Sequence, residues 1–375
     1  MSCPTSIAHL KSPMKNSRLL NGETRRLFLA VAATTSLLAV TFSLHAQESS
    51  EADAKTPKLP VNKIIATVSV GLAGTAGLVI TPDSSILYNA DDGASVIIRI
   101  NVSDPQNPVI GNAIATGSGG AIGNLAITPK GTTLYAVESI FPPYVEGSVA
   151  LFTNASSPNA AYSETIQGLG EEPGGIAVNP KGTQVYITDF GSASINVIDA
   201  KNNTLVPYQL QAGNGPTGLA FTPDGKYVYT ANFDDNTVVV TDAATRLLVG
   251  SPIPVGSNPQ SVVMAPKGET VYITNQDGTV SVIDTATNKV TATINTNSGN
   301  NHGYPGSAIT PNGKYLYVVA QSSLQVVMVN TATNQIVGKA IPVPNFPSYI
   351  VVAPDGKNAY IAANDEIFVV DITTN

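Results

Sequence analysis

Acidic side chains offer the clearest chemistry in the sequence, because several of them stand in adjacent pairs. The pairs are Asp91–Asp92, Glu171–Glu172 and Asp234–Asp235. Carboxylate oxygens are the ligands that Ca²⁺ and Mg²⁺ prefer, and a bound divalent cation can polarise a carbonyl group in a hydrolase. No EF-hand spacing accompanies these pairs, and acidic loops also keep a protein soluble. We therefore expect no cofactor, with a divalent cation at the acidic residues as the alternative.

Histidine and cysteine are too few for most catalytic constellations. The 375 residues include three histidines and one cysteine, and only His302 lies beyond residue 46. A structural zinc site takes its ligands from several such residues, so that class is excluded. A Ser-His-Asp hydrolase would depend on His302, and no Gly-x-Ser-x-Gly motif supplies a nucleophile. His302 stands in a polar loop. It could act as a general base there, or its side chain could simply be solvated.

A repeated unit must position these residues. A proline followed six residues later by a tyrosine recurs seven times, and successive prolines are 47, 51, 43, 43, 45 and 43 residues apart. Six of the seven units have glycine two positions after the proline. Proline fixes φ at the first position of a turn and glycine accepts a positive φ, so each unit contains a tight turn between two strands. The pairs are Pro82/Tyr88, Pro129/Tyr135, Pro180/Tyr186, Pro223/Tyr229, Pro266/Tyr272, Pro311/Tyr317 and Pro354/Tyr360.

The strand after each turn is apolar at successive positions, which is typical of a strand covered on both faces. Third and fourth strands follow, for example over residues 279–283 and 289–294. Four strands at a period near 43 residues predict a β-propeller, and seven units predict seven blades. The last unit lacks a fourth strand, and residues 62–68 resemble it. We therefore predict an all-β, seven-bladed propeller of four-stranded antiparallel blades over residues 61–375, closed by the N-terminal strand joining the last blade.

One unit carries a family resemblance. Residues 272–275 read Tyr-Ile-Thr-Asn and lie between Pro-Lys-Gly and Val-Ile-Asp-Thr-Ala-Thr-Asn segments. This unit resembles the YVTN-type propeller repeat of bacterial periplasmic and archaeal surface-layer proteins, and the resemblance covers about residues 61–375. It implies the fold rather than an activity, because the consensus residues build the blade. Related seven-bladed rings include lactonase-like enzymes and the haem domain of nitrite reductases.

The predicted ring separates charge between its two faces. Loops between the second and third strands share one face with the loops between blades, and we find no Lys or Arg in them. The opposite face carries lysines in its tight turns. An acidic face attracts cations and repels polyanions, so nucleic-acid binding is not expected. The acidic residues assigned to the first face are Asp91, Asp92, Glu138, Glu146, Glu171, Glu172, Asp189, Asp234, Asp235, Asp277, Asp365 and Glu366.

The candidate contacts for a ligand or a protein partner lie on this loop face. The segment 138–148 is longer than its counterparts and contains apolar residues, which suits a lid or a partner contact; a rigid loop folded on its own blade is the alternative. The candidates are Phe141, Tyr144, Glu171, Glu172, Asp189, Phe190, Phe233, Asp234, Asp235, Asp277, His302 and Tyr304.

The N-terminal segment predicts export. Residues 27–44 are apolar and follow Arg25 and Arg26, and Ala46 is a small residue at a cleavage position. These features predict a signal peptide over residues 1–46. Thr24–Leu29 also matches a twin-arginine signal, with ordinary secretion and an uncleaved anchor as alternatives. Residues 47–60 predict a linker. We expect a periplasmic or secreted monomer that meets the membrane only during export.

Composition narrows the functional classes further. The chain is 43% hydrophobic and 12% charged with a net charge of −7, which excludes a disordered protein. Only one apolar stretch approaches the length of a membrane span, which excludes a multi-span protein. We predict an exported, non-enzymatic binding or scaffold propeller that uses its acidic loop face. The alternatives are a Ca²⁺- or Mg²⁺-dependent lactonase-type hydrolase and a cell-envelope or surface-layer structural protein.

Overall fold

A computed structural model describes residues 58–71, 74–91, 95–116, 120–139, 146–297 and 306–374. Contacts divide the chain into two units, residues 1–54 and 55–375, and the description below concerns the second. The predicted signal peptide, most of the predicted linker, and Asp92, Phe141, Tyr144, His302 and Tyr304 lie outside the described residues. In the described part of the chain, no helix has the length and apolar character needed to cross a membrane.

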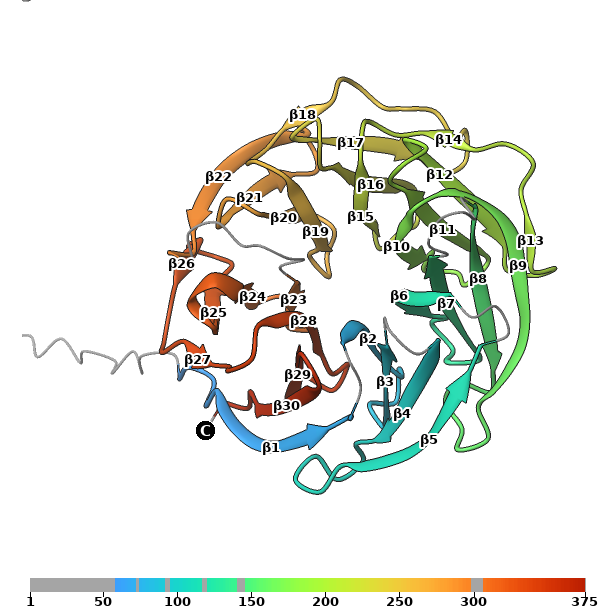
Figure 1. Ribbon diagram of the computed structural model, residues 1–375. Coiled ribbons are helices and arrows are strands. Elements are labelled where there is room, and N and C mark those ends of the chain that lie inside the picture. Colours follow the sequence, from blue (N-terminus) through green and yellow to red (C-terminus); the bar gives the residue numbers. More distant parts are fainter. Residues whose placement is uncertain are drawn as a thin grey trace, which may run out of the picture. The chain divides into compact units, whose positions relative to one another are not determined.

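Seven antiparallel sheets surround a common axis, which confirms the predicted seven-bladed propeller (Figure 1). Blade 1 contains β2 (Thr75–Ile80), β3 (Ile86–Asp91), β4 (Val96–Asn101) and β5 (Val109–Ala115). Blade 2 contains β6 (Ala121–Ile127), β7 (Thr133–Ser139), β8 (Glu146–Thr153) and β9 (Ala161–Glu171). Blade 3 contains β10 (Pro173–Val178), β11 (Gln184–Asp189), β12 (Ser194–Asp199), β13 (Thr204–Leu205) and β14 (Leu210–Gln211). Blade 4 contains β15 (Pro216–Phe221), β16 (Tyr227–Asn232), β17 (Thr237–Asp242) and β18 (Ile253–Pro254).

The remaining blades follow the same order from the axis outwards. Blade 5 contains β19 (Pro259–Met264), β20 (Thr270–Asn275), β21 (Thr279–Asp284) and β22 (Lys289–Asn295). Blade 6 contains β23 (Ser307–Ile309), β24 (Tyr315–Ala320), β25 (Gln325–Asn330), β26 (Gln335–Ile336) and β27 (Ile341–Pro342), with the short 3₁₀ helix η1 (Gln321–Ser323). Blade 7 contains β28 (Pro347–Val352), β29 (Asn358–Ala363), β30 (Glu366–Asp371) and β1 (Lys63–Ser69).

The hydrophobic core is a ring of layers between blades. The described residues form seven apolar clusters, and each cluster joins two successive blades, including the seventh and the first. Second strands are therefore buried on both faces, as their continuous apolar pattern predicts. The repeated tyrosine completes each layer. Tyr88 donates a hydrogen bond to the carbonyl of Ala155 at 2.7 Å, and Tyr229 donates one to Asn288 Oδ1 at 2.6 Å, each in the following blade.

The tight turns of neighbouring blades interlock on one face, here called the turn face. Gly225 has φ +71°, and a Cβ added there would lie 3.4 Å from Pro180 Cδ of the preceding blade. Each of the six turn glycines packs on the preceding blade's turn proline in this way. At the junction of blades 7 and 1, Ser84 Oγ accepts the backbone N–H of Asp355 at 3.2 Å.

The N-terminal strand closes the ring, as the sequence predicts. β1 pairs antiparallel with β30, and the two strands lie side by side in Figure 1. Tyr317 of blade 6 donates a hydrogen bond to Asn62 Oδ1 at 2.7 Å. Asn62 thus takes the place that Asn288 holds for Tyr229, so β1 replaces the missing outer strand in detail.

The outer strands are less regular than predicted. Blades 1, 2, 5 and 7 have continuous outer strands, whereas those of blades 3, 4 and 6 are broken into short pieces. Pro207 and Pro252 stand at the breaks in blades 3 and 4, and proline has no N–H for the sheet ladder. In blade 6 the break contains Gly338, whose φ is +72°. These breaks leave the axis of the ring untouched.

Candidate functional site

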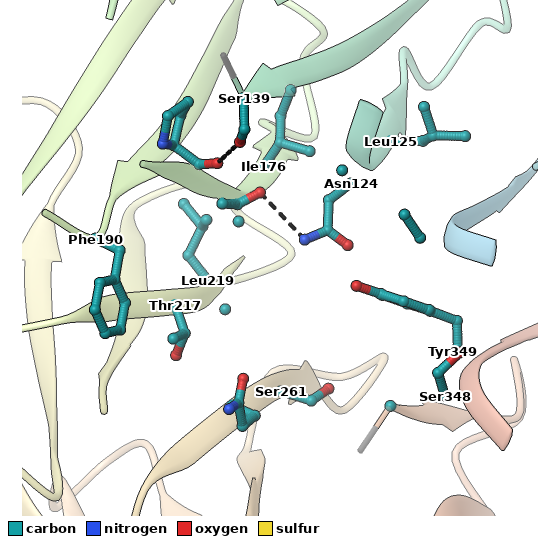
Figure 2. A pocket seen from close by; sticks show the side chains of 18 of the residues that line it. Asn124, Leu125, Ser139, Ile176, Phe190, Thr217, Leu219, Ser261, Ser348 and Tyr349 are labelled. Carbon is teal, nitrogen blue, oxygen red and sulfur yellow. Dashed lines mark hydrogen bonds between the residues drawn. The ribbon is translucent and has the colours of Figure 1, made fainter. Parts of the chain in front are cut away.

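A cavity of about 800 Å³ lies at the axis of the ring. The inner strands of all seven blades line it, and Figure 2 shows Asn124 and Tyr349 projecting into the space between those strands. An inner strand pairs on one side only, so its free edge offers backbone donors and acceptors to whatever occupies the axis. The cavity is therefore a space built from strand edges, in which apolar surface exceeds polar surface.

Glycines at one position of the inner strand keep this space open. The position is the fifth residue before the repeat proline, and four blades have glycine there. A Cβ added at Gly175 would lie 2.1 Å from the carbonyl oxygen of Thr217, and one at Gly218 would lie 2.4 Å from that of Gln260. Neighbouring inner strands thus approach too closely for a side chain at these two positions. The four glycines are Gly77, Gly175, Gly218 and Gly306.

Three blades have a polar side chain at the same position, namely Asn124, Ser261 and Tyr349. Asn124 Nδ2 donates to the carbonyl oxygen of Gly174 in the next blade at 3.1 Å, as drawn in Figure 2. Ser261 Oγ lies 3.1 Å from Ser307 Oγ of the next blade. The wall of the cavity is consequently uneven, with uncharged hydrogen-bonding groups on three sides and bare backbone between them.

One hydroxyl of the wall has no partner. Thr75 lines the cavity at the start of β2 and is 9% exposed, and its Oγ1 atom is buried without a hydrogen bond. A buried hydroxyl without a partner costs about 1–3 kcal/mol. The Oγ1 atom itself has almost no accessible surface, so a molecule in the cavity does not reach it.

The mouth of the cavity lies on the face opposite the tight turns, here called the loop face. Glu171, Glu172 and Phe190 line the cavity there. The Phe190 N–H donates to the carbonyl of Glu172 at 3.0 Å, so the loop after β11 binds the connection into β10. Phe190 also packs edge-to-face on Phe233 of the next blade, with ring centroids 5.9 Å apart. The two loop types share one face, as predicted.

Glu172 has an unusual backbone conformation. Its φ is +52°, and it stands directly before the first residue of the inner strand. The same position holds Gly215 in blade 4 and Asn258 in blade 5, also with positive φ. Glycine and asparagine tolerate this region, whereas other residues pay a steric cost there. The backbone at Glu172 is therefore more strained than at the equivalent residues of blades 4 and 5.

Three further predicted carboxylates lie away from the cavity, and two of them hold loops. Asp235 Oδ2 accepts the Asn214 N–H at 2.8 Å, and Asp277 Oδ2 accepts the Ser257 N–H at 2.8 Å. Asp234 is exposed beside Gly215. None of these three is among the described residues that line the cavity.

Asp189 is a strand residue and not the loop residue that the sequence analysis assumed. It ends β11, is fully buried, and accepts hydrogen bonds from Ser194 Oγ at 3.1 Å and from Asn196 Nδ2 at 2.5 Å. Burial raises the pKa of Asp189 from 3.8 to about 7, although hydrogen bonds from Ser194, the Gly170 backbone and Asn196 oppose the shift. It does not line the cavity.

The position of Asp189 is a repeated one, three residues after each tyrosine. Blades 1 to 3 have carboxylates there, blades 4 and 5 have amides, and blades 6 and 7 have alanine. All seven are buried, so the loop placement predicted for Asp91 and Glu138 is wrong as well. In order around the ring the residues are Asp91, Glu138, Asp189, Asn232, Asn275, Ala320 and Ala363.

The amides show what this position does. Asn232 Oδ1 accepts the N–H of Gly213, two residues before the positive-φ residue of the inter-blade loop, at 3.0 Å, and Nδ2 faces Thr237 Oγ1 at 3.4 Å. The side chain thus ties the blade's own third strand to the loop that precedes its first strand. Asparagine supplies both the acceptor and the donor that this junction uses.

The residues of the cavity wall were missed by sequence reasoning. Thr75, Asn124, Ser261 and Tyr349 were not among the predicted site residues, which were acidic and aromatic residues of the loop face. Alignment of the seven units on their prolines provides the signal, since four glycines and three polar residues then fall in one column. The described residues contain no group of three or more His, Cys, Asp or Glu side chains that could hold a metal ion.

Comparison with known proteins agrees with the fold. Residues 179–344 match the family described as "Lactonase, 7-bladed beta-propeller". This part of the chain is similar to the lactonase propellers. A solved structure titled "Kuenenia stuttgartiensis Hydrazine Synthase" superposes with a TM-score of 0.69 at 22% sequence identity, covering 82% of this chain and 98% of that chain. At that identity the likeness shows the fold alone. No curated protein sequence matches this chain.

Proposed function

We propose that the protein binds a small molecule in its axial cavity, entered from the loop face. The observation that carries the proposal is the cavity itself, whose volume of about 800 Å³ falls among those of ligand pockets. The uncharged groups of Asn124, Ser261 and Tyr349 line the cavity and supply orientation. The function is binding without catalysis, in an exported protein.

A variant that fills the cavity tests this proposal. Ser261→Tyr places in blade 5 the side chain that blade 7 carries at the same position as Tyr349, so the ring has a precedent for it. A library of small molecules is screened by ligand-observed NMR against the natural protein and this variant. We expect ligands that lose at least tenfold in affinity to Ser261→Tyr.

The matched control is Tyr208→Ser, because Tyr208 is 77% exposed beside the broken outer strand of blade 3. It should bind as the natural protein does, and thermal melts establish that both variants are folded. Ligands that bind Ser261→Tyr unchanged, or a library without any ligand, would contradict the axial site.

The match of residues 179–344 to a lactonase family favours one second candidate, a lactone hydrolase. In that function the mouth carboxylates would activate water or hold a divalent cation against the lactone carbonyl. Hydrolysis of a panel of lactones is followed by proton release, with and without added Ca²⁺ or Mg²⁺. Turnover that Glu171→Gln and Glu172→Gln abolish supports the hydrolase, and binding of lactones without turnover supports the binding protein.

A further inference from the structure

We propose that the ligand is an organic cation, with its charged end between Glu171, Glu172 and the ring of Phe190 and its body in the uncharged cavity. This inference rests on the proposed function, because it names the ligand class of the same cavity. Two features support it, the charge of the mouth and the aromatic residue beside it.

The carboxylates at the mouth are crowded and uncompensated. Glu171 ends β9 directly opposite Glu146 of β8, and Glu172 follows it in sequence. Like charges opposite each other destabilise a strand pair. No lysine or arginine lines the cavity, and the one ion pair of the described residues, Lys357 with Asp355, lies on the turn face. A cation at the mouth would relieve this repulsion.

An aromatic residue belongs to the same part of the mouth, because the Phe190 N–H binds the carbonyl of Glu172. Phe190 lines the cavity, and its edge-to-face contact with Phe233 holds the ring in place. The face of an aromatic ring attracts organic ammonium groups. A metal ion would use the carboxylates alone, whereas an organic cation uses both.

Three molecules of nearly the same shape show how the charge of a ligand, rather than its size, affects binding. Choline is the cation, 3,3-dimethylbutan-1-ol is its neutral counterpart, and 3,3-dimethylbutanoate is the anion. Binding is measured by calorimetry and ligand-observed NMR at low ionic strength. We expect choline to bind at least tenfold more tightly than the alcohol, the carboxylate to bind least, and the preference to shrink as salt rises.

Two variants assign the effect to residues. The double variant Glu171→Gln, Glu172→Gln should reduce choline affinity to that of the alcohol while alcohol binding stays the same. The matched control is Glu164→Gln, because Glu164 is an exposed glutamate of the same strand, away from the cavity lining.

The outcomes distinguish this inference from the proposed function. Equal binding of choline and the alcohol, or a preference that survives the double variant, overturns the cation assignment and leaves the axial site standing. If none of the three molecules binds, the test uses the net charge of the cavity ligands found in the library screen. A majority of neutral or anionic ligands among them overturns the inference. A library with no cavity ligand overturns the proposed function itself.

Discussion

The two faces of the ring are built on opposite principles. On the turn face, successive blades repeat the same contact, a glycine of positive φ packed on the proline of the preceding turn, as Gly225 is on Pro180. On the loop face, equivalent positions differ from blade to blade, as Glu172, Gly215 and Asn258 do. The turn face therefore holds blades together, and the loop face is free to carry chemistry.

The strand ends near the loop face also contain buried carboxylates. Carboxylates at Asp91, Glu138 and Asp189 occupy a buried position that amides and alanines fill elsewhere. Glu138 and Asp189 belong to blades 2 and 3, whose junction carries the mouth glutamates. Buried carboxylates are often found near functional sites in proteins.

The largest expected effect comes from replacing one of these buried carboxylates by the residue of its neighbours. Asp189→Asn should stabilise the protein above pH 7. Because the pKa of Asp189 is raised from 3.8 to about 7, the folded state holds a proton that the unfolded state releases, and stability falls as pH rises between these values. At pH 8 the full penalty, up to about 4 kcal/mol, is present in the natural protein.

Thermal melts of both proteins at pH 4 and pH 8 measure this effect. The gain should be large at pH 8 and small at pH 4, because pH 4 lies close to the unfolded-state pKa of 3.8 and little of the penalty has developed there. Equal melting temperatures at both pH values would show that the carboxylate is not penalised by burial.

A turn-face substitution should cost stability without affecting the ligand site. Gly225→Val places a β-branched side chain at φ +71° against Pro180, with an expected loss of about 2 kcal/mol. Gly225→Ser is the matched control, since blade 1 has Ser84 at this position with φ +61°, and it should cost less. Denaturant melts and choline binding are measured together. A change in affinity as large as that of the mouth variants would erase the distinction between the faces.

The smallest expected effect lies at the mouth and has the opposite sign. Glu172→Asn puts at φ +52° the residue that Asn258 provides in blade 5, so the protein should become more stable by about 1 kcal/mol. Choline affinity should fall at the same time, because a carboxylate is lost. Denaturant melts and calorimetry on the one variant give both values. A stable variant with undiminished affinity would show that Glu172 takes no part in binding.

The sequence predicts the frame of this molecule well. Seven prolines and tyrosines determine the blades, and residues 62–68 identify the closing strand, because these features repeat and each repeat has one physical explanation. Outer strands were predicted less well, since Pro207, Pro252 and Gly338 interrupt them without disturbing the repeat.

The site was harder to predict than the frame. Asp189 stood next to Phe190 at what looked like a loop, yet it occupies the position of Asn275 in the repeat and is buried. The axial wall escaped notice because its decisive residues are glycines, whose role follows from how closely neighbouring strands approach. That distance is a property of the closed ring, and no local pattern records it.

Closure of the ring by β1 also has a mechanical consequence. β1 and β30 run antiparallel, and Pro60 at the entry to β1 pairs with Thr374 just past the end of β30. The two points lie at the same end of the strand pair. A force applied there breaks the hydrogen bonds between β1 and β30 one after another, whereas a shearing force would load them together. The ring, which seven apolar layers hold together, would therefore open first at this seam under a modest force on these two points.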